Sequence, residues 1–128
     1  MEQAPIDFHK LRPAWRFGKM EMQDPFGWRD ISKEKLAEIR TKLSALENST
    51  WNDILVGSRK QNHFIPVTEL EPEAQRRLRE LHLDDIDAVI SLRLSGLERV
   101  FVIKFDVAVS LLWWDPNHLV CKSVLKHT

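Results

Sequence analysis

The stretch from Ile90 to Trp114 constrains the fold more than any other part of this sequence. Three runs rich in β-branched and aromatic residues lie at 90–94, 99–105 and 107–114, and each indicates a β-strand. Ser95-Gly96 separates the first two runs and is a turn signal. The stretch therefore predicts an antiparallel meander of three strands, and residues 118–121 are expected to add a short edge strand.

Two amphipathic helices are predicted upstream of this meander. Ser32 is an expected N-cap, and it precedes an apolar stripe at helical spacing formed by Leu36, Ile39, Leu43 and Leu46. Thr68 and Glu71 match a capping box before the second helix. The buried side of that helix is expected to consist of Leu70, Ala74, Leu78 and Leu81.

The order of these elements predicts an α+β fold. Residues 15–22 alternate apolar and polar side chains, as a half-buried N-terminal strand does. We therefore expect an N-terminal strand, two helices and a C-terminal antiparallel β-meander, with both helices packed on one face of the sheet. A length of 128 residues fits a single domain spanning 1–128, in which residues 1–13 form a loosely held lead-in.

The composition narrows the range of functions. Lysine plus arginine equals aspartate plus glutamate, at 19 each, so any contact with nucleic acid must come from a local cluster of charge. No apolar run has the ~18 residues of a membrane helix, and residues 1–5 do not resemble an export signal. A single cysteine, Cys121, favours a reducing compartment, so we expect a cytoplasmic protein.

Metal and cofactor chemistry are not expected. The five histidines show no pair at metal-ligand spacing, and Cys121 stands alone. With four glycines in the chain, no glycine-rich phosphate loop is present. The sequence therefore predicts neither a metal nor a cofactor.

The strongest candidates for chemistry are Arg93, Arg99 and His118. Arginine offers a fixed charge and a forked set of donors suited to phosphate, and histidine exchanges a proton near neutral pH. Glu98 and Asp115 are candidate proton acceptors nearby. A base, a cation facing the phosphate and an acid are the groups that metal-free RNA cleavage requires.

Four further residues are candidates for binding RNA. Lys122 and Lys126 add positive charge to the C-terminal tail. Trp113 or Trp114 can stack on a base, an interaction worth ~1–3 kcal/mol. Because neighbouring strand residues face opposite ways, one of these two tryptophans is expected in the core.

A purely structural role explains the same residues. Arg93 and Glu98 can pair across the first hairpin, and Arg99 can cap the edge of the sheet. Cys121 is expected to be a small buried hydrophobe.

Residues 92–103, and then Asn117-His118-Leu119-Val120 after one further strand, resemble the C-terminal half of RelE/ParE-superfamily toxins. In that family an arginine followed by apolar residues opens a strand, and a histidine lies near the C-terminus. The resemblance extends over residues 87–121, and upstream it is one of topology. The chain has no tyrosine, whereas the family commonly ends in one.

The resemblance implies a RelE-like fold and a metal-independent endoribonuclease that cleaves mRNA on the ribosome and is neutralised by an antitoxin protein. It implies that Arg99 stabilises the phosphate, that His118 is the acid or base, and that Arg93 is a basic site residue. The ParE branch implies an alternative, a non-catalytic module that binds and inhibits a protein target. A structural or immunity protein without toxicity is a third possibility.

Overall fold

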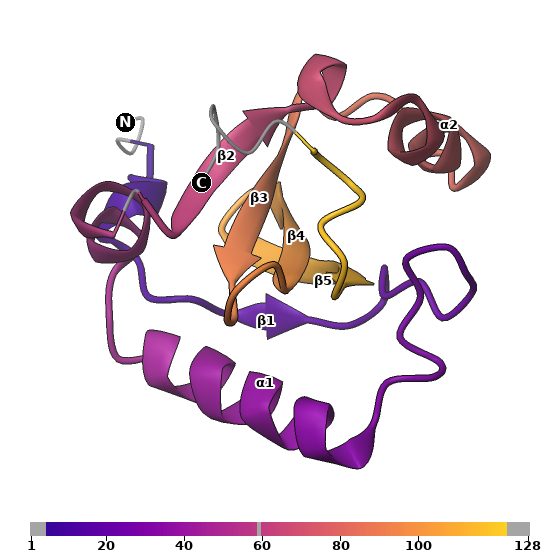
Figure 1. Cartoon of the computed structure of the whole chain (residues 1–128). Helices are drawn as coiled ribbons and strands as arrows, with labels where there is room; N and C mark the ends of the chain where they lie inside the picture. The colour runs from indigo at the N-terminus through magenta and orange to yellow at the C-terminus, as the bar shows by residue number, and fades with distance from the viewer. Residues whose placement is uncertain (1–4, 59, 123–128) are drawn as a thin grey trace.

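The computed structural model describes residues 5–58 and 60–122 and contains one mixed five-stranded sheet in the order β1-β5-β4-β3-β2 (Figure 1). Its centre is the predicted meander, formed by β3 (Ala88–Arg93), β4 (Arg99–Phe105) and β5 (Ala108–Asp115). Both pairings within the meander are antiparallel. The sequence prediction of three consecutive C-terminal strands is confirmed.

The two edges of the sheet come from the N-terminal half of the chain. β2 (Asn62–Pro66) pairs antiparallel with β3, and β1 (Trp15–Arg16) pairs parallel with β5. The strand predicted over residues 15–22 is thus reduced to two residues. The edge strand expected at 118–121 does not form, because β1 occupies the outer side of β5 and the chain turns away after Asp115.

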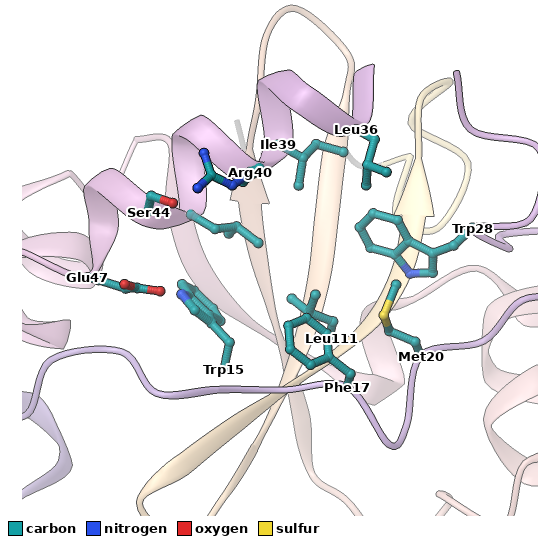
Figure 2. A pocket seen from close by; sticks show the side chains of 11 residues that line it. Trp15, Phe17, Met20, Trp28, Leu36, Ile39, Arg40, Ser44, Glu47 and Leu111 are labelled. Atoms are coloured by element: carbon teal, nitrogen blue, oxygen red, sulfur yellow. The ribbon is translucent and has the colours of Figure 1, made fainter. Parts of the chain in front are cut away.

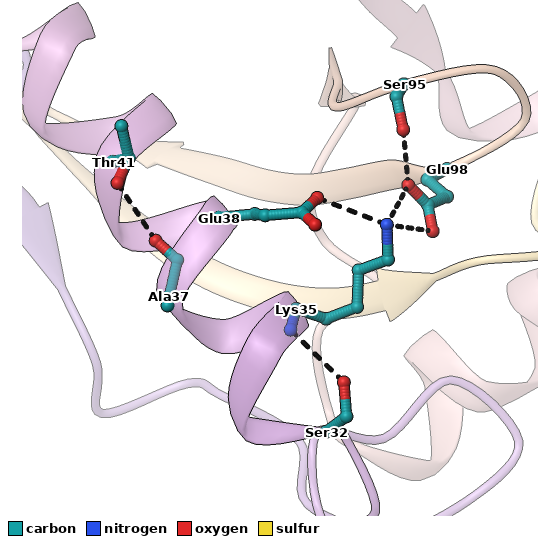
Figure 3. Close-up of polar contacts among 7 residues, drawn as sticks. All are labelled: Ser32, Lys35, Ala37, Glu38, Thr41, Ser95 and Glu98. Carbon is teal, nitrogen blue, oxygen red and sulfur yellow. Dashed lines mark hydrogen bonds and ion pairs between the residues drawn. The ribbon is translucent and has the colours of Figure 1, made fainter.

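Helix α1 (Lys33–Leu46) begins at the predicted cap, where Ser32 Oγ accepts a hydrogen bond from the Lys35 backbone N–H at 3.1 Å. The Lys35 ammonium links this helix to the β3–β4 turn, since Nζ lies 2.9 Å from Glu98 Oε2 and 3.1 Å from Glu38 Oε2 (Figure 3). Ser95 Oγ donates a hydrogen bond of 2.6 Å to the Glu98 carboxylate. These contacts fix the first turn of α1 over one end of the sheet.

Helix α2 (Pro72–Glu80) starts later than the sequence suggested. Its N-cap is Glu71, whose side chain makes no capping hydrogen bond, and residues 67–69 form a 3-10 turn. The predicted capping box from Thr68 to Glu71 is therefore wrong. Proline at the first helical position is compatible with this start, since its missing N–H has no helical acceptor there.

The helices pack on opposite faces of the sheet, so the prediction that both lie on one face is wrong. Ile39 and Leu43 of α1 join a core with Ile90, Leu92, Val100 and Val102. Ala74 and Leu78 of α2 join a second core with the alternate strand residues Val89, Phe101 and Ile103. The physical reason is visible in the strands, which are apolar on both faces and therefore require a cover on each.

A β-bulge in β5 changes the face of the sheet to which the last residues of the strand point. Phe101 pairs with Trp113, whereas Val102 pairs with Leu111, so Leu112 is the extra residue. Leu112 and Trp113 consequently both belong to the α2-side core, while Trp114 returns to the α1-side core. The bulge also puts Asp115 directly opposite Arg99, on the α2 face.

The N-terminal lead-in is more closely packed than the sequence suggested. Phe8 is buried and stacks on Trp51 with ring centroids 5.2 Å apart, and the Leu11 carbonyl accepts a 2.8 Å hydrogen bond from the Trp51 N–H. The expectation of a loosely held segment is therefore wrong from Phe8 onward. Residues 1–4 lie outside the described part of the chain.

Candidate functional site

Three charged residues form a row across the end of the sheet on the α2 face. Arg93 on β3 pairs directly with Arg99 on β4, and Arg99 pairs with Asp115 on β5. The two arginines therefore lie side by side, an arrangement in which like charges directly opposite each other destabilise a sheet. The fold brings these two predicted site residues together at a cost in stability.

Arg99 is the most unusual member of this row. Its side chain is almost fully covered, and Nη1 donates to the backbone carbonyls of Gly96 at 2.7 Å and Glu98 at 3.1 Å. Burial lowers the pKa of the Arg99 guanidinium, the neighbouring Arg93 lowers it further, and Asp115 acts in the opposite direction. Among the described residues no carboxylate forms an ion pair with Arg99, so this charge is short of an anion.

Asp115 serves the turn that follows β5. Its Oδ1 accepts from the Leu119 N–H and its Oδ2 from the Val120 N–H, both at 2.9 Å. The turn then reaches α2, where the Val120 carbonyl accepts from the Glu71 N–H at 2.9 Å. Asp115 thus holds the turn of residues 116–119 at the end of β5, and its two oxygens are already engaged by backbone donors.

His118 lies within this turn in a left-handed conformation, with φ 58°. That conformation is uncommon for a residue other than glycine, although histidine adopts it more readily than most. The ring is buried, and within the described chain neither Nδ1 nor Nε2 has a hydrogen-bond partner. An imidazole buried without partners is costly, so the turn is a place where a bound group would restore hydrogen bonds.

The two tryptophans predicted to bind RNA are buried and not exposed beside this row. Trp113 is completely buried on the α2 side, where its Nε1 donates to Glu21 Oε1 at 2.9 Å, and Trp114 packs against Trp28 on the opposite face. The expectation that one of the two remains available for stacking is wrong. Lys122 is exposed, with Nζ 4.0 Å from Glu71 Oε1, and Lys126 lies outside the described residues.

The alternative pairing of Arg93 with Glu98 does not form. Glu98 is held by Ser95 and Lys35, and the hydrogen bond from Ser95, followed by that from Lys35, lowers the pKa of the Glu98 carboxyl. Cys121 is buried as expected, and its Sγ lies 3.5 Å from the Glu69 carbonyl oxygen. Glu98 does form an ion pair, but its partner is Lys35 and not Arg93.

Sequence reasoning missed a buried charged cluster centred on Glu21. The Glu21 carboxylate accepts from the Nε of Arg77 at 2.5 Å, forms an ion pair with the Nη2 of the same arginine, and accepts from Trp113. Hydrogen bonds from Arg77, first to Glu21 and then to Glu80, raise the pKa of the Arg77 guanidinium. A glutamate between two methionines, Met20 and Met22, was the only sign of it in the sequence.

Sequence reasoning also missed an apolar hollow on the α1 side. It lies between α1 and the segment from Trp15 to Trp28, and Leu111 is at its base (Figure 2). Phe17 and Leu36 are largely exposed beside it. This hollow is separated from the arginine row by the whole thickness of the sheet.

The arginine row can bind an anion, and the histidine in the adjoining turn can exchange a proton with a bound group. The described residues contain no group of three or more histidine, cysteine or acidic side chains placed to hold a metal ion. Within the same residues, each helix is too short or too polar to cross a bilayer. Comparison with models of known protein families, with curated proteins and with solved structures finds nothing that matches this chain.

Proposed function

We propose that this chain is a toxin-like endoribonuclease that cleaves mRNA, on the ribosome, without a metal, and that an antitoxin protein neutralises it in the cytoplasm. The observation that carries the proposal is the adjacency of Arg93 and Arg99, with Arg99 buried and lacking a carboxylate partner among the described residues. A phosphodiester supplies the negative charge that this pair lacks. The antitoxin and the ribosome rest on the family resemblance alone.

In this mechanism Arg99 stabilises the charge that develops on the pentacoordinate phosphate. Preorganised donors in a site that excludes water are the most effective way to stabilise such charge. His118 transfers the proton, and Asp115 acts indirectly by holding the turn that carries His118. Since Arg99 and His118 are covered, the turn of residues 116–119 must open for RNA to reach them.

The experiment compares Arg99→Met with the unchanged protein. Methionine keeps an unbranched apolar side chain and removes a buried charge, so we expect folding stability to be equal or greater by roughly 1 kcal/mol. The rate of mRNA cleavage by the purified protein should fall by at least about 100-fold, as when one charge-stabilising donor is removed. Expression of the variant should no longer arrest growth. His118→Gln should abolish cleavage in a folded protein as well.

The matched control is Arg79→Met, which removes an arginine from the exposed side of α2. It should leave growth arrest and cleavage unchanged. Folded Arg99→Met that is as toxic and as active as the original chain would contradict the proposal.

A second candidate is a non-catalytic module that binds and inhibits a protein target. The burial of both Trp113 and Trp114 favours it, because neither of these two predicted stacking residues is exposed to receive a base. In this case expression arrests growth while mRNA on translating ribosomes stays intact. Toxicity that persists in folded His118→Gln would support this candidate over the first.

A further inference from the structure

The hollow on the α1 side has the size and lining of a small-molecule site. Its volume is about 360 Å³, within the range typical of ligand pockets. Ile39 and Leu43 of α1 and Leu111 of β5 line it from the core, and Trp28 lines the end nearer the start of the helix. The sheet separates this hollow from the arginine row, so it belongs to a different site.

Its other end is polar. Arg40 and Ser44 of α1 and Glu47, which directly follows the helix, line the hollow at this end (Figure 2). None of these three side chains forms a hydrogen bond or ion pair with another described residue. The polar end therefore offers one cation, one carboxylate and one hydroxyl, all uncommitted.

The two tryptophans that line the hollow differ in how their indole N–H groups are satisfied. Trp28 Nε1 donates to the Leu112 carbonyl at 3.1 Å. Trp15 Nε1 is buried and has no acceptor within the described chain, and Figure 2 shows it on the side facing Glu47. A buried indole N–H normally has a partner, so an acceptor is missing at the polar end.

We propose that this hollow binds a small apolar molecule with an uncharged amide head group. The apolar chain lies between Leu36 and Leu111, and the amide reaches the polar end. Its carbonyl accepts from Trp15 Nε1 and from the Arg40 guanidinium, and its N–H donates to the Glu47 carboxylate.

Other head groups match this end less well. A carboxylate satisfies Arg40 but is repelled by Glu47, and a pure hydrocarbon leaves Trp15 Nε1 unpaired. An amide has both an acceptor and a donor, as the mixed set of side chains requires.

The test titrates the full chain with octanamide, octanoate and octane and follows the indole N–H signals by NMR. The chain has five tryptophans, so each supplies one signal. Octanamide should shift the Trp15 signal saturably and to a larger extent than that of Trp113, which lies on the far face. Octanoate should bind about tenfold more weakly, the loss expected when a hydrogen bond to a charged group is replaced by repulsion.

Glu47→Gln removes the repulsion and keeps a hydrogen-bonding group, so it should bring octanoate to within about twofold of octanamide. Glu34→Gln, an exposed carboxylate on the same helix that does not line the hollow, is the matched control and should preserve the tenfold difference. Equal binding of all three probes to the unchanged chain would overturn the assignment of an amide head group. The absence of a saturable Trp15 shift would overturn the site. Shifts that depend on protein concentration alone would also overturn it, because they would mean that a second copy of the chain covers this face.

Discussion

The two faces of the sheet are closed in different ways. On the α2 face, Glu21 joins the N-terminal segment to Arg77 of the helix and to Trp113 of the sheet, and the polar groups of this cluster are paired with one another. On the α1 face the helix packs through Ile39 and Leu43 but leaves an open hollow beside Leu36. A charged cluster thus fastens α2 to the sheet, while the middle of α1 packs on the sheet through the apolar side chains of Ile39 and Leu43.

This difference shows where each face can accommodate a ligand. The α2 face has a surplus of positive charge at one end, where Arg93 and Arg99 lie opposite each other. The α1 face has apolar space and an unsatisfied indole N–H at Trp15. We propose an anion for the first and an apolar amide for the second, because in each case the ligand provides what the surrounding residues lack.

The largest expected effect comes from removing the fastening on the α2 face. Glu21→Ala leaves the Arg77 guanidinium and the Trp113 N–H without their acceptor, so we expect the free energy of unfolding to fall by about 3 kcal/mol. Urea denaturation followed by circular dichroism measures this loss. Glu80→Ala removes the other, more exposed carboxylate partner of Arg77 and should cost less than about 1 kcal/mol. Equal losses in the two variants would show that Glu21 does not hold the face together.

Much of the fold could be predicted from the sequence, because its periodic parts are long. The strands β3 to β5 and the Ser32 cap of α1 follow from alternation and from capping chemistry. The faces that the helices cover could not be predicted, since β4 is apolar on both sides and matches either arrangement. A strand was predicted over residues 15–22, but its restriction to Trp15–Arg16 and its parallel pairing with β5 could not be predicted, because two residues carry no periodic signal.

The candidate site was predictable only in part, for a related reason. A two-residue turn at Ser95-Gly96 would place Arg93 opposite Glu98, whereas the loop of residues 94–98 places Arg93 opposite Arg99. The bulge at Leu112 is invisible in the sequence, yet it decides that Trp113 faces α2 and that Asp115 faces Arg99. A strand that alternated without interruption would place Trp113 and Asp115 on the α1 side with Leu111, and the charged row would not exist.

A smaller effect is expected when the two tryptophans of the hollow are compared. Trp28→Phe removes a hydrogen bond to the Leu112 carbonyl, whereas Trp15→Phe removes an N–H that has no acceptor among the described residues. Trp28→Phe should therefore lower the free energy of unfolding by about 1 kcal/mol more than Trp15→Phe does. Urea denaturation without added ligand measures both. A larger loss for Trp15→Phe would mean that its indole is already satisfied and that the hollow lacks its unpaired donor.

The smallest effect is a pH dependence at the junction between α1 and the β3–β4 turn (Figure 3). Hydrogen bonds from Ser95 and then from Lys35 lower the pKa of Glu98 in the folded protein. A carboxyl whose pKa is lower in the folded than in the unfolded state stabilises the fold above its unfolded pKa of about 4.3, and this contribution is lost as the pH falls through the folded pKa.

Glu98→Gln has no such group, so its stability should fall less steeply than that of the original chain as the pH is lowered from about 5 to about 3. Thermal unfolding at a series of pH values measures the two slopes. Lys35 does not interfere, because its pKa is raised and its contribution is lost only in the alkaline range. Parallel slopes for the two proteins would show that the Glu98 contacts do not hold α1 against the turn. In that case apolar packing would hold α1 on the sheet, whereas the ion pair between Glu21 and Arg77 holds α2.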